Sequence, residues 1–464
     1  MLVSNYREIR LYAVGYGRKD YEAFDLSTMV SNPHNYRRFM LLLAAENLLS
    51  GNTLKLLKDS DAVEKEITKE LYAEYKATRS HLIDEIVGDN KKMPPLRAVQ
   101  LAQTILDRVL FVAFAEDKRL LKKDTLKEAF ETKNPYSPQP AWDNFKGLFK
   151  AIDKGNARLN VPGYNGGLFA DNAGIDALEL SDETCKRFAD LGAYDYDSEV
   201  SVNILGHIFE QSISDLEEIK KALDPDSVPL EEVGSKRRTD GIFYTPPFVT
   251  RQIVEQAVGK WLADKKKELG FSNLEPLTEA DLASIKLPTK GKGKSTSKIA
   301  YNAAVEMHIQ FWEGYRDCLS SIKVLDPACG SGAFLNEVFD YLYSEGQSVN
   351  RALETLFEGQ INLFRWDTHI LANNLFGVDI NRESIEITKL SLWLKTANQN
   401  EKLSYLDDNI KTGNSLINDA RIAGELAFDW KTEFKPVMDA GGFDVVVGNP
   451  PYVDSRAVQF SMKA

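Results

Sequence analysis

Residues 321–335 read SIKVLDPACGSGAFL, a short apolar strand that runs into a glycine-rich turn and the start of a helix. Gly330 and Gly332 allow the backbone to approach a ligand closely, and the first helical turn offers N–H groups that lack helical partners. The spacing differs from the dinucleotide-binding pattern, and no lysine follows as in a phosphate-binding loop. Asp326 at the strand tip instead suits a cofactor that ends in an amino acid. The segment predicts the first unit of a doubly wound α/β sheet, with its helix running to about residue 344.

The sequence predicts two more strand ends of the same sheet. Residues 374–380 (NLFGVDI) lead to Asp379, where an acidic side chain is placed to bind two ribose hydroxyls. The alternative is that Asp379 or Asn381 caps the helix that follows. The long separation from the glycine turn predicts an extra helix within residues 349–373. Residues 407–416 (DDNIKTGNSL) contain the third strand end, where Asn414 either contacts an adenine ring or belongs to an ordinary turn.

Residues 441–452 (GGFDVVVGNPPY) form a hydrophobic strand that ends in an asparagine, two prolines and a tyrosine. The Asn449 side chain and the Pro450 carbonyl are suited to accept hydrogen bonds from both N–H groups of a planar amine. Such bonds pull the nitrogen toward tetrahedral geometry and direct its lone pair at a methyl donor. Tyr452 is suited to stack on a base turned out of a duplex. The alternative is an ordinary turn after a buried strand.

Four motifs in this order, DPACGSG, GVDI, GNSL and NPPY, resemble the motif series of S-adenosylmethionine-dependent N6-adenine DNA methyltransferases. Residues 241–249 (GIFYTPPFV) resemble the motif that closes over the methionine end of the cofactor in that family, and they also suit a helix start. The resemblance implies catalytic roles for Asn449, Pro450, Pro451 and Tyr452. It implies cofactor contacts for Tyr244, Thr245, Pro246, Asp326, Pro327, Ala328, Cys329, Gly330, Gly332, Phe334, Asp379, Ile380 and Asn414. Phe334 either lies beside the adenosine or packs in the core.

The motif order resembles the gamma arrangement of these enzymes, in which the DNA-recognition domain follows the catalytic domain. Residues 2–14 alternate apolar and polar side chains like one strand without a nearby partner, so residues 1–20 resemble a strand remnant of an upstream nuclease-like domain. Similarity to fused type IIG restriction-modification enzymes implies a helical connector over residues 21–235. It implies the N-terminal part of a Rossmann-like methyltransferase sheet over residues 236–464, with a flexible Gly/Ser/Lys-rich insertion at about residues 286–298. We therefore expect an internal fragment, a truncated gene product or one piece of a split enzyme, without the recognition domain.

Two segments of the connector have a helical pattern. Residues 62–76 and 96–117 carry apolar side chains at three- and four-residue spacing, and the second segment is apolar on most faces. It is predicted to form the core of a bundle. Arg108, Glu116 and Asp117 on this segment are predicted to be solvated helix-end charges rather than buried ion pairs.

Other parts of the connector carry weaker signals. Residues 160–169 and 205–213 resemble recurrent connector elements of the fused enzymes. His207 is predicted to be a packing or hydrogen-bonding residue, because no second histidine or cysteine lies at metal-ligand spacing, and no metal is expected. The basic run at residues 235–239 is predicted to be a solvated loop.

The formal net charge of −12 argues against a strong grip on DNA by this chain alone, because contacts to phosphates dominate such affinity. The expected recognition domain would supply the basic surface. Cys185, Cys318 and Cys329 form no disulfide framework, and there is no signal peptide and no apolar run of roughly 20 residues. These features predict that the protein is located in the reducing cytoplasm. Cys329 is predicted to be a small packing residue, because no base neighbours it in the sequence.

The most specific function that the resemblance implies is site-specific methylation of the adenine N6 amino group in double-stranded DNA, within a restriction-modification or phage-defence system. The DNA would be held through the recognition domain expected outside this chain, and a separate chain is a possible source of the missing parts. Methylation of a protein glutamine is an alternative, because the same asparagine–proline–proline–tyrosine chemistry grips an amide nitrogen. An inactive truncated scaffold is the alternative outside the enzyme class.

Overall fold

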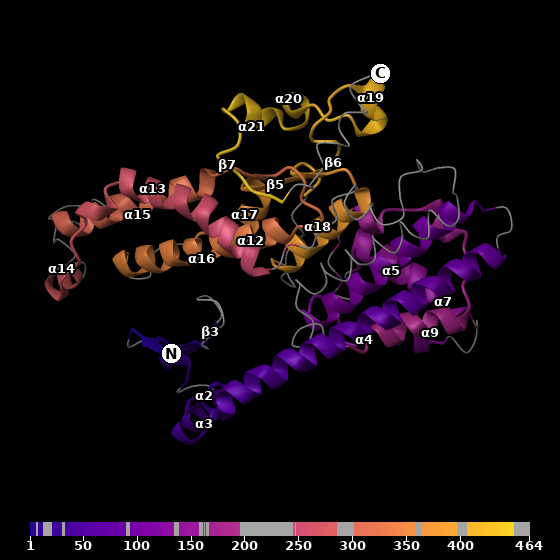
Figure 1. Ribbon diagram of the computed structural model, residues 1–464, viewed down its shortest axis with the longest axis horizontal. Helices are drawn as coiled ribbons and strands as arrows, with labels where there is room; N and C mark the ends of the chain where they lie inside the picture. Colours follow the sequence, from indigo (N-terminus) through magenta and orange to yellow (C-terminus); the bar gives the residue numbers. More distant parts are fainter. Residues whose placement is uncertain are drawn as a thin grey trace, which may run out of the picture. The chain divides into compact units, whose positions relative to one another are not determined.

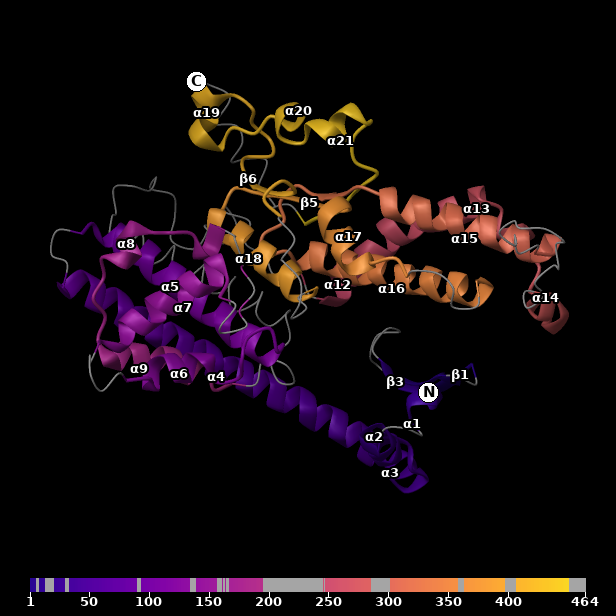
Figure 2. The ribbon, with the colours of Figure 1, turned by 180° about the vertical axis from the view of Figure 1, so that it is seen from behind.

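The protein was analysed as a computed structural model whose described residues fall into two compact units, Met1–Ala73 and Glu74–Ala464. The described residues are 1–5, 8–12, 21–29, 33–89, 93–133, 139–156, 161, 163, 167–194, 245, 247–284, 301–357, 363–396 and 406–449. Figures 1 and 2 show the elements from opposite sides.

The first unit begins with a three-stranded antiparallel sheet in the order β1 (Leu2–Ser4), β2 (Glu8–Tyr12), β3 (Tyr21–Asp25). The prediction of a single strand without a partner over residues 2–14 is therefore wrong. Asn5 follows β1, and its side-chain oxygen accepts a hydrogen bond of 2.7 Å from the N–H of Glu8, the first residue of β2. Strands β1 and β2 pair antiparallel, with Leu2 opposite Leu11. Helices α1 (Leu26–Met29), α2 (Pro33–Leu43), α3 (Ala45–Ser50) and the start of α4 (Asn52–Asp89) follow.

The second unit contains a group of helices, here called the helical part, around the apolar helix α5. Its elements are α5 (Pro95–Asp117), α6 (Thr125–Glu131), α7 (Ala141–Lys154), η1 (Gly167–Phe169), α8 (Ala173–Asp176) and α9 (Asp182–Leu191). Helix α5 is buried along most of its length, which confirms its predicted place in the core of a bundle. By length and composition alone α5 would also pass as a membrane span, but 89% of its most apolar window is buried inside the protein.

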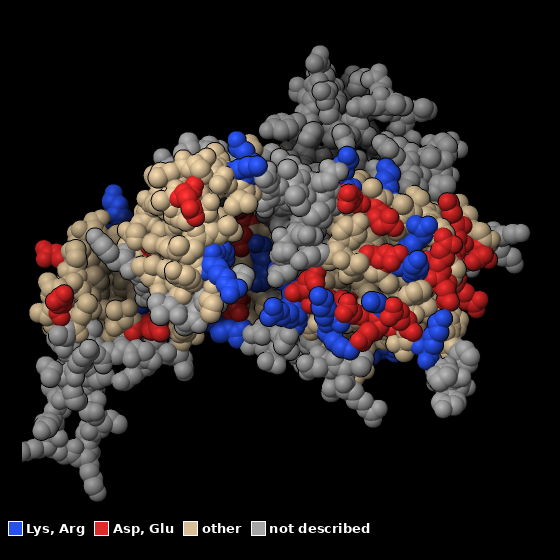
Figure 3. Space-filling model, turned by 90° about the horizontal axis from the view of Figure 1, so that it is seen from below, with Lys and Arg blue, Asp and Glu red and all other residues tan. Residues whose placement is uncertain are grey.

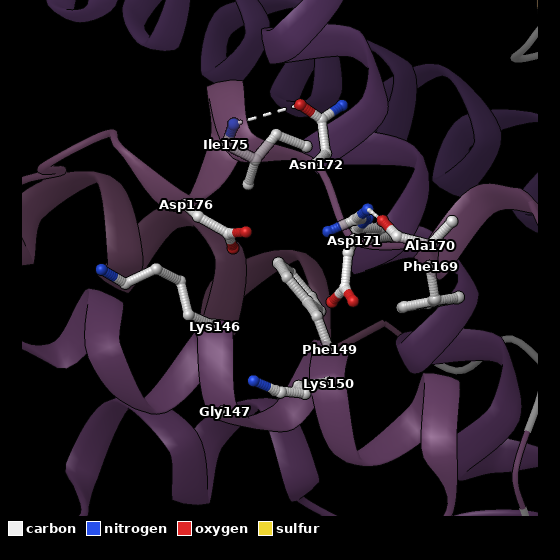
Figure 4. A pocket seen from close by; sticks show the side chains of 11 residues that line it. Lys146, Gly147, Phe149, Lys150, Phe169, Ala170, Asp171, Asn172, Ile175 and Asp176 are labelled. Atoms are coloured by element: carbon white, nitrogen blue, oxygen red, sulfur yellow. Dashed lines mark hydrogen bonds between the residues drawn. The ribbon is translucent and has the colours of Figure 1, made fainter.

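Arg108 on α5 is buried, with only 4% of its surface exposed, so the prediction of a solvated charge is wrong. Its Nε donates to the carbonyl oxygen of Leu168 at 2.8 Å, and its Nη2 donates to that of Ala170 at 2.9 Å. The rings of Phe149 and Phe169 lie 5.5 and 5.7 Å from the guanidinium. Desolvation lowers the Arg108 pKa, although nearby aspartates counteract the effect. A cavity of about 200 Å³ beside this guanidinium has walls from α5, α7, η1 and α8 (Figure 4).

Glu116, near the end of α5, is also buried, again contrary to the prediction. Its carboxylate accepts a hydrogen bond of 2.8 Å from the N–H of Leu126, and burial raises its pKa to about 7. Asp117 is more exposed, as predicted. Neither Arg108 nor Glu116 relies on an ion pair within the described residues, because main-chain groups from later segments satisfy both side chains.

The rest of the second unit is built around a parallel four-stranded sheet in the order β6-β5-β4-β7. The strands are β4 (Val324–Asp326), β5 (Leu375–Asp379), β6 (Ile410–Thr412) and β7 (Val445–Val446). The chain proceeds outward from β4 to β6 and then returns to β7 on the other side of β4. The boundary between β4 and β7 is thus a topological switch point, where doubly wound sheets bind their ligands. The predicted α/β fold class is confirmed, with helices in the majority.

Helices cover both faces of this sheet. One group comprises α12 (Pro247–Val254), the π-helical turn η3 (Glu255–Gly259), α13 (Lys260–Glu268), α15 (Ala303–Ser321), α16 (Ala333–Leu356), α17 (Trp366–Asn373) and α18 (Arg382–Leu394). The opposite face is covered by α20 (Trp430–Glu433) and α21 (Lys435–Asp439), as Figure 1 shows. Within β4, Val324 belongs to the first core and its neighbour Leu325 to the second, as expected for alternating side chains of a strand. The outlying elements are η4 (Phe271–Asn273), α14 (Glu279–Ser284), α19 (Ala420–Ala423) and η5 (Gly424–Leu426).

An aromatic stack joins the helical part to the sheet part. The ring of Phe111 on α5 lies 4.7 Å from the ring of Trp393 on α18, with an angle of 14° between the planes. Both side chains are buried. Helix α18 is therefore packed on the sheet on one side and on α5 at its C-terminal end.

Candidate active site at the carboxyl ends of the strands

Asp326 lies at the tip of β4 and is completely buried. Its Oδ1 accepts a hydrogen bond of 3.1 Å from the N–H of Ala328, whereas Oδ2 has no hydrogen-bond partner among the described residues. Burial raises the pKa of this carboxyl group to about 7, the Ala328 N–H lowers it, and the nearby Asp379 raises it further. A buried acidic oxygen without a partner is costly, so the site favours a ligand that brings an N–H donor or a positive charge.

The predicted glycine turn after β4 is present, and two of its glycines have a positive φ. Gly330 has a φ of +53° and Gly332 a φ of +86°, both in the left-handed region that favours glycine. A Cβ atom on Gly332 would lie 2.9 Å from Cγ2 of Thr388, so this position also has no room for a side chain. Helix α16 starts directly after Gly332 and presents its N-terminus to the site.

Asp379, at the tip of β5, faces the glycine turn. Its Oδ2 accepts a hydrogen bond of 2.9 Å from the N–H of Gly330, and its Oδ1 accepts one of 2.8 Å from the N–H of Asn381. Asn381, not Asp379, is the residue whose side chain caps α18, by accepting from the N–H of Ser384 at 3.0 Å. Burial raises the pKa of Asp379, although three backbone N–H groups lower it. Next to it, Ile380 is 53% exposed.

Asn449 lies just beyond β7, close to Asp326. The N–H of Val447 donates to the carbonyl oxygen of Leu325 at 2.9 Å, so the two strands stay paired to this point. A Cβ atom on Gly448 would lie only 2.8 Å from Oδ1 of Asp326, which shows how closely the two strand tips approach. The tips of β4 and β7, which carry Asp326 and Asn449, therefore lie side by side.

The Asn449 side chain has a defined orientation. Its Nδ2 donates a hydrogen bond of 3.2 Å to Oγ1 of Thr245, which is 7% exposed. Thr245 comes from the segment before α12, far away in the sequence, and the structure brings it to the same strand tip. Among the described residues the amide oxygen of Asn449 accepts no hydrogen bond, so it could accept one from a ligand.

Three of the predicted cofactor residues have local roles in the structure. Asn414 accepts a hydrogen bond of 3.0 Å from the N–H of Leu416 and so closes its own turn. Phe334 is buried among the core residues under the sheet, which favours the core alternative. Cys329 is buried as well, and desolvation raises its pKa well above the usual value, so it is a neutral packing residue as predicted. Pro327 and Ala328 are partly buried in the turn itself.

Several predicted residues lie outside the described part of the chain. They are Tyr244, Pro246, His207, Pro450, Pro451 and Tyr452, together with half of residues 160–169 and all of residues 205–213, 235–239 and 286–298.

Thr388 is one residue at this site that sequence reasoning missed. It lies on α18, and its hydroxyl donates to the carbonyl oxygen of Gly330 at 2.8 Å. The available signal was the spacing of the polar residues Ser384, Thr388 and Ser391, which places them on one face of α18. All three are buried, so that face is directed inward.

Comparison with known proteins shows similarity to restriction-modification enzymes and DNA methyltransferases. Residues 373–463 match the Eco57I restriction-modification methylase family. Over 366 residues the chain is 26% identical to a putative type II restriction enzyme and methyltransferase of Methanocaldococcus jannaschii, an alignment that covers 68% of this chain and 27% of the relative. It is 24% identical to DNA methyltransferase A of Bacillus subtilis over 404 residues (84% and 38%), and 24% identical to the Eco57I type II restriction enzyme and methyltransferase of Escherichia coli over 395 residues (80% and 32%). The chain thus spans about a third of the length of these curated relatives.

Among solved structures, the type IIL restriction-modification enzyme MmeI in complex with DNA is similar, with a TM-score of 0.51 and 19% identity. The match covers 82% of this chain and 43% of that chain, and it supports the fold. These findings confirm the resemblance to restriction-modification methyltransferases.

Proposed function

We propose that this chain carries the cofactor site and the amine-binding asparagine of a DNA methyltransferase, which transfers a methyl group from S-adenosylmethionine to the N6 amino group of adenine. The enzyme would act in the cytoplasm, within a restriction-modification or other phage-defence system. The observation that carries the proposal is the close approach of Asp326 and Gly448, the residue before Asn449, at the switch point of the sheet.

The residues at the strand tips fit S-adenosylmethionine. Oδ2 of Asp326, which is buried and has no partner among the described residues, would accept a hydrogen bond from the ammonium group of the methionine end. Asp379 already accepts two backbone N–H groups, and its remaining lone pairs suit the ribose hydroxyls. The cofactor supplies a methyl group on a positively charged sulfur.

Asn449 would bind the amine that receives the methyl group. Because its Nδ2 donates to Thr245, its Oδ1 is directed at the ligand and would accept an N–H of the target amine. The hydrogen bond would make the nitrogen lone pair more available to the methyl group that the cofactor would supply, and the amine would release its extra proton to solvent. The contributions of Pro450 and Tyr452 remain predictions.

DNA is favoured over a protein glutamine as the substrate by the names of the relatives, which are restriction enzymes and DNA methyltransferases. The surface of the described residues gives no strong basic face on the side drawn in Figure 3, where acidic and basic side chains are interspersed. With a net charge of −12, we expect this chain alone to bind DNA weakly and with a strong dependence on salt.

The test is a methyl-transfer assay with the full-length protein, S-adenosylmethionine and adenine-containing duplex DNA, with the digested DNA analysed by mass spectrometry. We expect N6-methyladenine with the wild type. Asn449→Ala should abolish product while cofactor binding, measured by calorimetry, survives. The exposed Asn273→Ala is the matched control and should leave both unchanged.

Two results would contradict the proposal. Methylation of a glutamine in a protein substrate but not of DNA would support the protein-methyltransferase alternative. A wild-type protein that binds no S-adenosylmethionine would support the inactive-scaffold alternative.

A further inference from the structure

Helix α18 packs against the glycine turn of the proposed cofactor site through Thr388. Thr388, in the middle of this helix, is completely buried, and its Oγ1 donates to the carbonyl oxygen of Gly330 at 2.8 Å. Inside a helix, a threonine hydroxyl commonly bonds to a carbonyl of the preceding turn of its own helix. Here the hydroxyl instead donates to a different segment, the glycine turn that we propose to face the cofactor.

Both backbone groups of Gly330 make hydrogen bonds to residues of β5 and α18, which follow each other in the chain. Its N–H donates to Oδ2 of Asp379 at 2.9 Å, and its carbonyl oxygen accepts from Thr388. Glycine has the widest backbone freedom of all residues, so its φ of +53° is not fixed by its own side chain. The two hydrogen bonds supply that restraint and, at the same time, orient the carboxylate of Asp379.

The hydroxyl of Thr388 makes a hydrogen bond, whereas its methyl group packs against the glycine turn. A Cβ on Gly332 would lie 2.9 Å from Cγ2 and 3.0 Å from Oγ1 of Thr388, so the methyl group fills the space behind the second glycine. The hydroxyl alone bonds to Gly330. Valine therefore keeps the packing and removes the hydrogen bond, and serine keeps the hydrogen bond and removes the methyl group.

A buried polar chain fixes the position of Thr388 itself. Nδ2 of Asn336 on α16 donates to Oγ of Ser391 at 2.9 Å, and that hydroxyl donates to the carbonyl oxygen of Thr388 at 3.0 Å. Each of the three side chains is buried. Helices α16 and α18, which flank the turn, are thus linked through the residue that holds it.

We propose that Thr388 is a positioning residue for the cofactor: its hydroxyl holds the Gly330 turn and, through it, the Asp379 carboxylate in the arrangement that binds S-adenosylmethionine. This inference rests on the proposed function. It assigns Thr388 no contact with the reacting atoms. Its loss should therefore weaken cofactor binding and leave the methyl-transfer step at saturating cofactor unchanged.

The experiment compares Thr388→Val and Thr388→Ser with the wild type in the full-length protein. Calorimetry gives the Kd for S-adenosylmethionine, and steady-state assays on duplex DNA give its KM and kcat. We expect Thr388→Val to raise Kd and KM by about tenfold, the order expected for a buried carbonyl left without its donor, with kcat unchanged. Thr388→Ser should restore Kd to within about threefold of the wild type, because it keeps the hydroxyl donor.

Thr184→Val is the matched control. Thr184 is also completely buried, but it lies on α9 in the helical part and bonds to Glu85 there. The same exchange at this site should lower the melting temperature without raising the cofactor Kd. A purely structural effect would appear in both valine variants.

The outcomes separate this inference from the proposed function. If the wild type binds S-adenosylmethionine and Thr388→Val binds it equally well, the positioning role is wrong and the proposed function stands. Equal weakening in Thr388→Val and Thr388→Ser, or a fall in kcat without a rise in KM, would also overturn it. If the wild type binds no S-adenosylmethionine, both the positioning role of Thr388 and the proposed function are wrong.

Discussion

Nδ2 of Asn449 donates a hydrogen bond of 3.2 Å to Oγ1 of Thr245, although 204 positions separate the two residues in the sequence. The bond decides which end of the amide faces the ligand. Without it, the amide could turn and present its N–H₂ group, which cannot accept a hydrogen bond from an amine.

The first prediction concerns this bond. Thr245→Val should lower kcat about tenfold, because the Asn449 amide loses the acceptor that orients it. Thr245→Ser should retain at least about half of the wild-type kcat, since it keeps the hydroxyl acceptor. The measurement is single-turnover methyl transfer at saturating cofactor and DNA. Equal rates for the valine and serine variants would show that the hydroxyl does not orient the amide.

The second prediction concerns the approach of β7 to β4. Gly448→Ala should lower the free energy of unfolding by about 1–3 kcal/mol, because the new Cβ would lie 2.8 Å from Oδ1 of Asp326 and force the strands apart. Cofactor affinity should fall with it. Gly147→Ala is the control: this exposed glycine inside α7 has nothing within 4 Å of its Cβ position, and the exchange should stabilise the protein slightly. Urea unfolding compares the two, and equal stability would contradict the close approach.

The third prediction concerns pH. Burial raises the pKa of Asp326 from 3.8 to about 7, so the folded state keeps this proton at pH values where the unfolded state has lost it. Stability without ligand should therefore decline from about pH 4 to about pH 7 and then level off. Asp326→Asn should remove this part of the decline.

Urea unfolding at pH 5 and pH 8, without cofactor, measures the effect. Glu116 also has a pKa raised to about 7, but it is present in both proteins and cancels in the comparison. The same loss of stability between the two pH values in wild type and Asp326→Asn would show that Asp326 does not hold its proton.

The fourth prediction concerns the helical part. Arg108→Met should lower the free energy of unfolding by about 2–4 kcal/mol, since it leaves the carbonyl oxygens of Leu168 and Ala170 without their donors. Arg421→Ala, which changes a side chain that is 89% exposed, should stay within about 0.5 kcal/mol of the wild type. Guanidinium unfolding measures both. A similar small effect for the two arginines would mean that the buried hydrogen bonds add little.

The strand tips were predictable because their signals are local. A short apolar run that ends in aspartate and glycines specifies a strand and a turn within a few residues, and Asn381 before an amphipathic stretch specifies a helix start. The order of these units along the chain then predicts a doubly wound sheet. The hydrogen bond between Asn449 and Thr245 was not predicted, since no local pattern connects the two residues and the family resemblance implied only a cofactor contact for Thr245.

The errors came from contacts that no local pattern contains. Helix α16 continues past the predicted end at about residue 344 to Leu356. Gly346 lies inside the helix, where a Cβ would clash with the ring of Trp366, so the glycine allows α17 to pack closely. The predicted extra helix is α17, which is shorter than the range that was expected to contain it. Arg108 likewise finds its acceptors about 60 positions later in the chain.

The ring stack between Phe111 and Trp393 has a mechanical consequence for the glycine turn. Thr388 and Trp393 are five residues apart on one helix, about 7.5 Å along its axis. Since a helix transmits displacement as a stiff rod, a tilt of α5 would be relayed through Trp393 to the Thr388 hydroxyl and on to Gly330. The helical part would thereby bear on the position of the turn that we propose to bind the cofactor, although none of its residues lies in that turn.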